Sequence, residues 1–508
     1  MRRRGRRGRD RASDRRGAPG VASPSPNGSP ARRTRRAPAL VLLVALLAAG
    51  GVIDRRARAA PTAATTITAQ VPLAAPVSAR SSAWYCPGGL AGNAAADASV
   101  VVANAGTRAL NGTVTVFPDK GDSHQAPITV GPAGRASLRL ADVVSSTYAS
   151  AVVELDGGDA VVETVASGTL GDSFTPCASS ASSSWYFAEG ATTKDATETL
   201  LALNPFPDDA VIDVVFSTEE GTVTPQALTG LLVKGQALTT INVGDYVQRR
   251  ESVSVSLVAR TGRLVLGRLQ TFDGTGTGGR KGLSIGLGAA APGPVWYFPE
   301  GLTADGVGER FQIYNPGSQE AQVQLSLVLD AGEAEPLQVT VPRESRVTVI
   351  ANDESRIPKG VGHSVTVSTT SGPDVVVERT VDGTSPSTRL GLSIALGARL
   401  PATRWAVAAG GADDANDAWV VVQNPGTRSA QVTVNLLGDG TQTIVGGLAS
   451  VEVPAGQRRE LHLNPTLKRA TTPLILTASA PVVVEHDSYK VKAPGLAMSA
   501  AIPLREPT

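Results

Sequence analysis

Cysteine, histidine and aromatic residues are all scarce in this chain of 508 residues, and each scarcity limits the kinds of functional site that the chain can form. Its two cysteines are too few, and too far apart, for a C-x-x-C redox pair or a thiolate zinc site. The four histidines stand at unrelated positions, whereas a metal site needs ligands that converge. We therefore expect no catalytic, metal-binding or cofactor-binding residue, and we expect all four histidines at the surface: His124, His363, His462 and His486.

Aromatic residues make up 4% of the chain, yet four of its five tryptophans recur at regular intervals of 101, 111 and 109 residues. An asparagine follows each of them at 20, 19, 19 and 19 residues. Such a period indicates one duplicated folding unit. A scarce, large residue used once in each repeat is expected to anchor a core. These landmarks are Trp84, Trp185, Trp296 and Trp405, followed by Asn104, Asn204, Asn315 and Asn424.

Each repeat is rich in short strands rather than helices. The third repeat alternates apolar and polar residues from Val323 to Leu329, which indicates a strand with one buried face. Its Asn315-Pro316-Gly317 segment predicts a type II turn. Seven or eight such strands in about 108 residues are typical of an antiparallel sandwich. We predict an all-β protein of four tandem Ig-like β-sandwiches, each with its own core. The alternative is a propeller-like closed array.

The predicted segments follow from composition and from the period. A disordered Arg-rich tail comes first, then an apolar helix, a flexible stalk and four sandwiches. Their limits are 1–36 for the tail, 37–53 for the helix, 54–80 for the stalk, and 81–180, 181–292, 293–401 and 402–508 for the repeats.

The basic charge of the chain is confined to its N-terminal tail. Residues 1–36 contain 13 Arg, no Lys and two Asp, which leaves the remainder mildly acidic although the whole chain has a net charge of +2. The repeats therefore lack the basic patch of a nucleic-acid-binding protein. Residues 37–53 carry no charge and are just long enough for a membrane helix. With the Arg-rich tail before it, this helix predicts a single-pass anchor with a cytoplasmic N-terminus and extracellular repeats. The alternative is a cleaved signal peptide and a secreted protein.

Cys86 and Cys177 flank the first repeat, 91 residues apart. In an exported protein this placement predicts a disulfide.

Several short motifs resemble a known family. They are the Trp-Tyr-Phe-x-Glu-Gly opening at Trp296, the Asn-Pro-Gly turn, and an apolar run before Glu378, Glu485 and Glu163, with Gly267 at this place in the second repeat. Together they resemble actinobacterial envelope proteins of unknown function over residues 80–508. The resemblance implies an exported, anchored, β-rich protein and no established activity.

Other motifs suggest catalysis or binding but have structural explanations. Gly282-Leu283-Ser284-Ile285-Gly286 fits a nucleophile elbow, yet its counterparts lie in strands. The glycine-rich segment 274–279 leads into a strand, not the helix that a phosphate loop needs. The acidic loop near Asp413 lacks the glycine and bidentate Glu of an EF-hand. Glu189 and Glu300 could be glycosidase carboxylates, but we expect a strand-end or turn-capping role.

The sequence therefore predicts a non-enzymatic scaffold or adhesin at the cell surface. Its expected partners are the membrane, through the N-terminal helix, and a cell-wall glycan or an envelope protein. The alternatives are a sugar-binding lectin, whose Trp-Tyr pairs would be exposed, or an envelope enzyme.

Overall fold

The structure is a computed structural model that describes residues 70–330 and 332–506, all within one compact unit, 63–508. The predictions for 1–36, 37–53 and most of the stalk lie outside the described residues. Among the residues described, no helix is long and apolar enough to cross a membrane. The described part is all-β apart from four short 3-10 helices: η1 (Leu140–Asp142), η2 (Gln226–Leu228), η3 (Val243–Asp245) and η4 (Ala351–Asp353).

The first unit, 82–176, pairs two antiparallel four-stranded sheets in the orders β1-β6-β3-β4 and β5-β2-β7-β8. Its strands are β1 (Ser82–Leu90), β2 (Asp97–Asn104), β3 (Leu110–Pro118), β4 (His124–Val130), β5 (Gly134–Arg139), β6 (Tyr148–Leu155), β7 (Ala160–Gly168) and β8 (Gly171–Pro176).

The second unit, 184–287, repeats this plan with the orders β12-β11-β15-β9 and β14-β10-β16-β17, and β13 also pairs with β11. Its strands are β9 (Ser184–Phe187), β10 (Ala196–Asn204), β11 (Ala210–Thr218), β12 (Gly221–Val223), β13 (Thr229–Val233), β14 (Ala237–Asn242), β15 (Val253–Thr261), β16 (Val265–Asp273) and β17 (Lys281–Leu287).

The third unit, 295–396, has the orders β18-β24-β20-β21 and β23-β19-β25-β26, with β22 beside β20. Its strands are β18 (Val295–Phe298), β19 (Val307–Asn315), β20 (Ala321–Leu329), β21 (Gly332–Glu333), β22 (Leu337–Val341), β23 (Ser345–Ile350), β24 (His363–Ser371), β25 (Val376–Gly383) and β26 (Gly391–Leu396).

The fourth unit, 402–503, joins its two sheets through one long strand, β33, which pairs with strands of both. The corresponding position of the third unit is broken at Gly372-Pro373, where the glycine has φ +84°, a value that favours glycine. The strands of the fourth unit are β27 (Ala402–Val407), β28 (Asn416–Gln423), β29 (Ala430–Gly438), β30 (Thr441–Ile444), β31 (Val451–Val453), β32 (Arg458–His462), β33 (Leu474–Lys490), β34 (Leu496–Ala500) and β35 (Ile502–Pro503).

The four recurring tryptophans are the largest buried side chains of the units. Each indole is at most 1% exposed and packs in the apolar core of its own unit. The prediction that they anchor the cores is therefore confirmed. The cores are not independent, however, because the cluster around Trp84 also contains Ile475 and Ile502 of the fourth unit.

The recurring asparagines close the turn that follows each of their strands. The Asn315 amide donates to the Gln319 carbonyl at 2.7 Å and to Val341 at 3.1 Å, while its oxygen accepts from the Gly317 amide at 2.9 Å. Asn104, Asn204 and Asn424 make the same set of contacts. The predicted type II turn is wrong, since Gly317 is not among the glycines with positive φ. The asparagine side chain, rather than a left-handed glycine, holds this turn.

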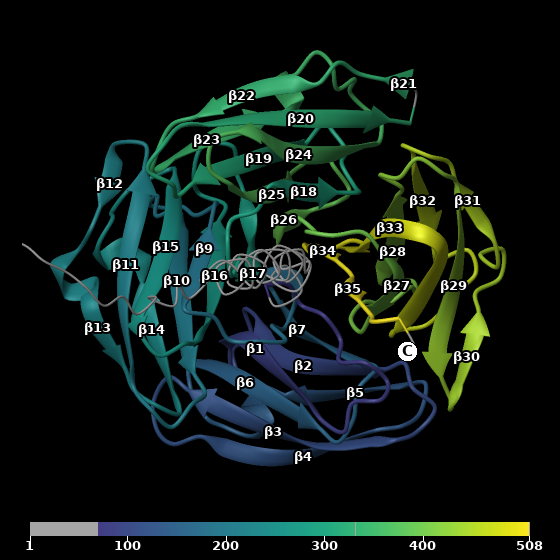
Figure 1. Cartoon of the computed structure of the whole chain (residues 1–508), viewed down its shortest axis with the longest axis horizontal. Coiled ribbons are helices and arrows are strands. Elements are labelled where there is room, and N and C mark those ends of the chain that lie inside the picture. The colour runs from purple at the N-terminus through teal and green to yellow at the C-terminus, as the bar shows by residue number, and fades with distance from the viewer. Residues whose placement is uncertain (1–69, 331, 507–508) are drawn as a thin grey trace, which may run out of the picture. The chain divides into compact units, whose positions relative to one another are not determined.

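The last strands of the units contact one another in a closed cycle. β8 contacts β17, β17 contacts β26, β26 contacts β34, and β34 contacts β8. Figure 1 shows the sheets of the four units arranged about β17, β26 and β34. The sequence favoured separate modules in a row. That expectation is wrong because residues assigned to turns and strand ends bind the neighbouring unit.

Candidate functional site: the seams between units and the axial pocket

A buried ion pair joins the second and third units. Arg268 of β16 donates two hydrogen bonds to the Glu378 carboxylate of β25, both at 2.9 Å. Glu378 also accepts the backbone amides of Ala188 and Glu189 at 2.8 Å. Burial acts to lower the pKa of Arg268, but the Glu378 carboxylate prevails and raises it. Arg268 and Glu378 therefore form an ion pair that is buried within the seam between these units, and of the described guanidinium nitrogens of Arg268 only Nε is left without a hydrogen-bond partner.

The same arrangement recurs at two other seams. Between the third and fourth units, Arg379 binds Glu485. Between the fourth and first, His486 lies 2.9 Å from Glu163, which accepts the amides of Ala408 and Ala409 at 2.7 Å. Burial pushes the pKa of Glu163 upward, but His486 and the two amides outweigh it and hold that pKa below its ordinary value. At each of these seams, a glutamate of one unit binds an arginine or a histidine of the preceding unit.

The seam between the first and second units lacks this pair. Thr164 stands where the other units have a cation, and Gly267 stands where they have the glutamate. Pro87, which has no N–H to offer a carboxylate, packs directly on Gly267. This seam is instead apolar, built on Phe117, Val152, Leu201, Leu203 and Leu238.

We expect Gly267→Ala to destabilise the protein by about 1–3 kcal/mol, the usual cost of overpacking. A Cβ added at Gly267 would lie 2.5 Å from the Pro87 Cβ. Urea unfolding of the full chain measures the loss. Gly131→Ala is the matched control, because Gly131 is exposed, is not among the glycines with positive φ, and an added Cβ would meet nothing within 4 Å. Equal stability of Gly267→Ala and the wild type would contradict the close packing of this seam.

Glu189 and Glu300 stand two residues beyond the ends of β9 and β18, but they do not cap turns, so that part of the expectation is wrong. Each pairs with an arginine of the next unit: Glu189 lies 2.6 Å from Arg346, and Glu300 binds Arg458. Both carboxylates are buried, with exposures of 3% and 5%, and each is sealed in a seam rather than opposed across an open cleft. The two-acid geometry of a glycosidase is therefore not formed by these residues.

Glu198 is buried beside the Arg268–Glu378 pair, and neither of its carboxylate oxygens has a hydrogen-bond partner in the described structure. Burial raises its pKa to about 8. The folded protein therefore holds a proton on Glu198 at pH values where the unfolded chain has released it. Stability from this group is present below its ordinary pKa and is lost as pH rises toward 8.

Glu198→Gln is expected to flatten the fall in stability between about pH 4.5 and pH 8, a fall of at most about 1.4 kcal/mol per pH unit from this residue. The neutral amide cannot ionise, so the variant should be more stable than wild type above pH 8. Urea midpoints across this pH range are the measurement. Glu452→Gln, at an exposed edge position, is the control. A pH slope unchanged from that of the wild type would show that Glu198 is ionised in the folded protein.

Ser284 of the elbow-like motif binds the next unit. Its hydroxyl accepts the Ile394 amide at 3.0 Å and donates to the Ile394 carbonyl at 3.2 Å. Ser393 makes the same contacts with Met498. Ser284 thus lies in β17 without a strand-to-helix turn. The glycine-rich segment 274–279 is the loop between the paired strands β16 and β17.

Two of the four histidines contradict the prediction of surface positions. His363 is fully buried, 2.9 Å from Glu309, and His486 is 4% exposed in the closing seam. His124 is exposed and His462 is partly exposed, stacked on Trp419 at 4.1 Å. In the acidic loop, the Asp413 carboxylate accepts the amides of Ala415 and Asn416. The described residues include no group of three or more His, Cys, Asp or Glu placed to hold a metal.

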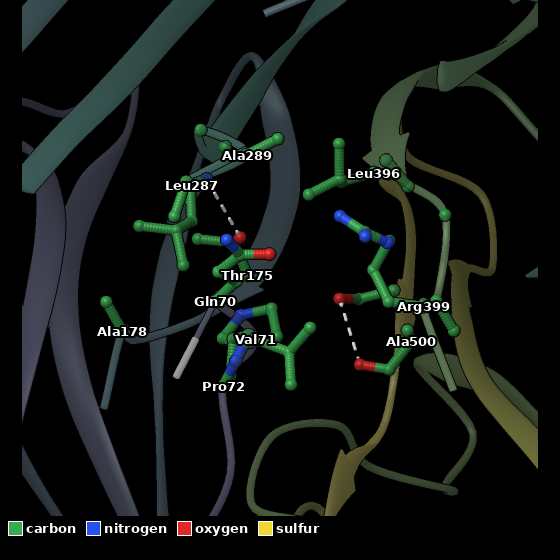
Figure 2. A pocket seen from close by; sticks show the side chains of 18 of the residues that line it. Gln70, Val71, Pro72, Thr175, Ala178, Leu287, Ala289, Leu396, Arg399 and Ala500 are labelled. Atoms are coloured by element: carbon green, nitrogen blue, oxygen red, sulfur yellow. Dashed lines mark hydrogen bonds between the residues drawn. The ribbon is translucent and has the colours of Figure 1, made fainter. Parts of the chain in front are cut away.

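A narrow apolar pocket, called the axial pocket, lies where the last strands of the four units meet: β8, β17, β26 and β34. Figure 2 shows Thr175, Leu287, Leu396 and Ala500, one from each unit, around the chain segment Gln70–Pro72. About 90 Å³ remains free beside this segment.

The described part of the predicted stalk is fixed to the units rather than free. The Ser179 hydroxyl donates to the Val71 carbonyl, and the Leu73 amide donates to that hydroxyl, both at 3.2 Å. Farther along, the buried Ala74 donates to Pro503 of the fourth unit at 3.1 Å. The flexible stalk predicted for 54–80 is therefore wrong over 70–80. Its small apolar residues fill the pocket and bridge the first and fourth units.

The arginines and the histidine of the seams were not predicted from the sequence. The signal was present: the residue after the glutamate position is Arg268, Arg379 or His486 in three repeats. Arg346 and Arg458 also stand at equivalent places in their repeats. Each pairs across the sheet with the residue before the recurring asparagine, Tyr314 or Gln423. The predicted disulfide does form between Cys86 and Cys177 and links the two sheets of the first unit.

Comparison with known proteins finds one family. The model of the family of unknown function DUF5719 matches residues 164–361 and again residues 275–494. No curated protein matches the chain.

Solved structures give only distant similarity. Thermotoga maritima 1070 is 17% identical over 21% of this chain and 95% of its own, with a TM-score of 0.20. The Anabaena sensory rhodopsin transducer is 23% identical over 17% and 94%, with a TM-score of 0.16. A tetra-tandem repeat from the extending region of a large adhesion protein is 15% identical over 83% and 99%, with a TM-score of 0.10.

Proposed function

Because this chain belongs to the family of unknown function DUF5719, no known activity guides its assignment, and we propose that it is a non-enzymatic scaffold of the cell envelope. Four Ig-like sandwiches would act as one rigid body that presents a surface to the cell wall, to a polysaccharide or to an envelope protein. The actinobacterial source follows from the motif resemblance alone.

The observation that carries this proposal is the use of buried charge in the seams. Glu189, Glu300, Glu378 and Glu485 could have served catalysis, yet each is bound to an arginine of a neighbouring unit. Buried pairs of this kind fix how the units are arranged. A body held rigid in this way would keep binding surfaces of different units in constant register.

We place the body outside the cytoplasm. The Cys86–Cys177 disulfide supports this, since such bonds persist in oxidising compartments. Residues 37–53 would anchor the chain in the membrane with the N-terminus inside, and cleavage and secretion is the alternative.

Binding to envelope material is the test of the scaffold proposal. The full chain, solubilised in mild detergent, is mixed with isolated cell-wall glycans and with an envelope protein extract. We expect enrichment of one wall fraction or one protein at physiological salt. No enrichment from either would defeat the proposal.

Location is tested separately on intact cells. We expect the full chain to resist extraction with alkaline carbonate, and external protease to digest residues 70–506 while sparing the N-terminal tail. Protection of the units from protease on intact cells, combined with their digestion once the membrane is opened, would place them inside the cell and contradict the proposed export.

A further inference from the structure

A second cavity lies open to solvent at the seam between the second and third units. It has a volume of about 640 Å³, within the usual range for small-ligand sites. Tyr186 and Val258 of the second unit form one wall, and Tyr314 and Pro316 of the third form the other. Unlike the axial pocket, it holds no segment of the described chain.

The corresponding place in the preceding seam is filled. Phe206 occupies the turn position that Gly317 occupies in the third unit. Its ring lies 6.3 Å from that of Tyr85, the counterpart of Tyr186, and Arg263 covers it at 4.5 Å. Gly317 has no side chain to take this place, so Tyr186 stays partly exposed in the cleft.

The cleft walls combine flat apolar surface with hydroxyl groups. Tyr186 and Pro316 supply the apolar faces. The Tyr314 hydroxyl lies 2.8 Å from Ser256, and Thr222 and Thr224 are exposed at the rim. Tyrosine suits such a place because it has an apolar body and a polar tip.

The charged residues that line the cleft are both acidic, and the partly buried Arg399 outside the lining is close enough to Asp374 for their charges to interact. Glu344 and Asp374 line it and are exposed, and no lysine, arginine or histidine is among its lining residues. Carboxylates accept strong hydrogen bonds from hydroxyl and ammonium donors. They would repel a ligand that carries carboxylate or phosphate groups.

We propose that this cleft binds a saccharide made of neutral or amino sugars, an inference that rests on the proposed scaffold function and names its ligand class. The apolar faces of the sugar rings pack on Tyr186 and Pro316. Sugar hydroxyl or ammonium groups donate to Glu344 and Asp374. A proline-rich peptide would also suit the aromatic and proline surfaces, but it would leave the two carboxylates without donors.

The test is affinity electrophoresis of the full chain in mild detergent through gels containing one polysaccharide each. The probes are glycol chitosan, hydroxyethyl cellulose and alginate. We expect retardation by the amino or the neutral polymer and none by alginate. Val258→Arg would place a long cation in the cleft from a side chain that is 46% exposed, much as Arg263 fills the preceding seam. We expect it to weaken retention about tenfold or more.

A second variant separates hydrogen bonding from net charge. Glu344→Ala with Asp374→Ala removes the two carboxylate acceptors and should weaken retention about tenfold. Asp208→Asn with Asp353→Asn removes two exposed charges elsewhere and should leave retention unchanged. Urea midpoints equal to that of the wild type would show that all these variants fold.

Retention that persists in Val258→Arg, retention by alginate alone, or displacement by a proline-rich peptide instead of a sugar would overturn the cleft assignment. So would the absence of retention by any polymer. If the chain still enriches wall material or an envelope protein in these cases, the scaffold function stands and only the saccharide cleft fails.

Discussion

Replacing Glu378 with alanine is expected to lower the free energy of unfolding by about 3–5 kcal/mol. The change leaves Arg268 as an unpaired charge in a seam where its side chain has no exposed surface. It also removes the acceptor for the amides of Ala188 and Glu189. Desolvated groups without partners account for losses of this size. Urea unfolding of the full chain, followed by tryptophan fluorescence, measures the effect.

Two controls separate the ion pair from the loss of a side chain. Glu452→Ala removes an exposed glutamate and should change stability by less than about 0.5 kcal/mol. Glu378→Leu combined with Arg268→Met replaces both charges with apolar groups, and it should cost less than Glu378→Ala alone. If Glu378→Ala matched the exposed control, the seam would not depend on this pair.

Loss of the Cys86–Cys177 disulfide is expected to cost about 4–5 kcal/mol, because the bond closes a loop with a sequence separation of 91 residues. The first unit has no cation–glutamate pair at its seam with the second unit. Its stability is therefore expected to depend more strongly on the disulfide. The double variant Cys86→Ser with Cys177→Ser should unfold at a lower urea concentration than the oxidised wild type.

Reduction of the wild type provides the matched comparison. The chain contains two cysteines, so a reductant has one disulfide to act on. Reduced wild type should approach the double variant, and the double variant should not respond to reductant. A reduced wild type as stable as the oxidised form would contradict a stabilising role for the bond.

Much of the fold within a unit could be predicted from the sequence. The period-two pattern from Val323 to Leu329 lies within β20, whose alternating apolar residues are buried as predicted. The buried indoles could be predicted because the tryptophans recur at a regular spacing along the chain. The disulfide could be predicted because the chain has two cysteines, which lie at the two ends of one repeat. The alternating pattern predicts the strands correctly because each strand must bury one face against the other sheet of its own unit.

The contacts between units could not be predicted in the same way. Glu189 looked like a turn residue, and its partner Arg346 lies 157 residues away along the chain. Periodicity shows which face of a strand is buried. It does not show whether the other sheet of the same unit or a neighbouring unit covers that face. The cation after the glutamate position was a usable signal, since a charge next to a buried apolar run needs a partner.

The closed cycle of units is tested most directly at the seam between the fourth unit and the first. Lys490 lies 2.9 Å from Asp172 across this seam. A carbodiimide joins amine and carboxylate only when they are in contact, so mass spectrometry of the dilute full chain should find an intramolecular Lys490–Asp172 cross-link. The cross-link should disappear in Asp172→Asn. Its absence from the wild type, or its appearance only between two chains at high concentration, would mean that the four units form an open row.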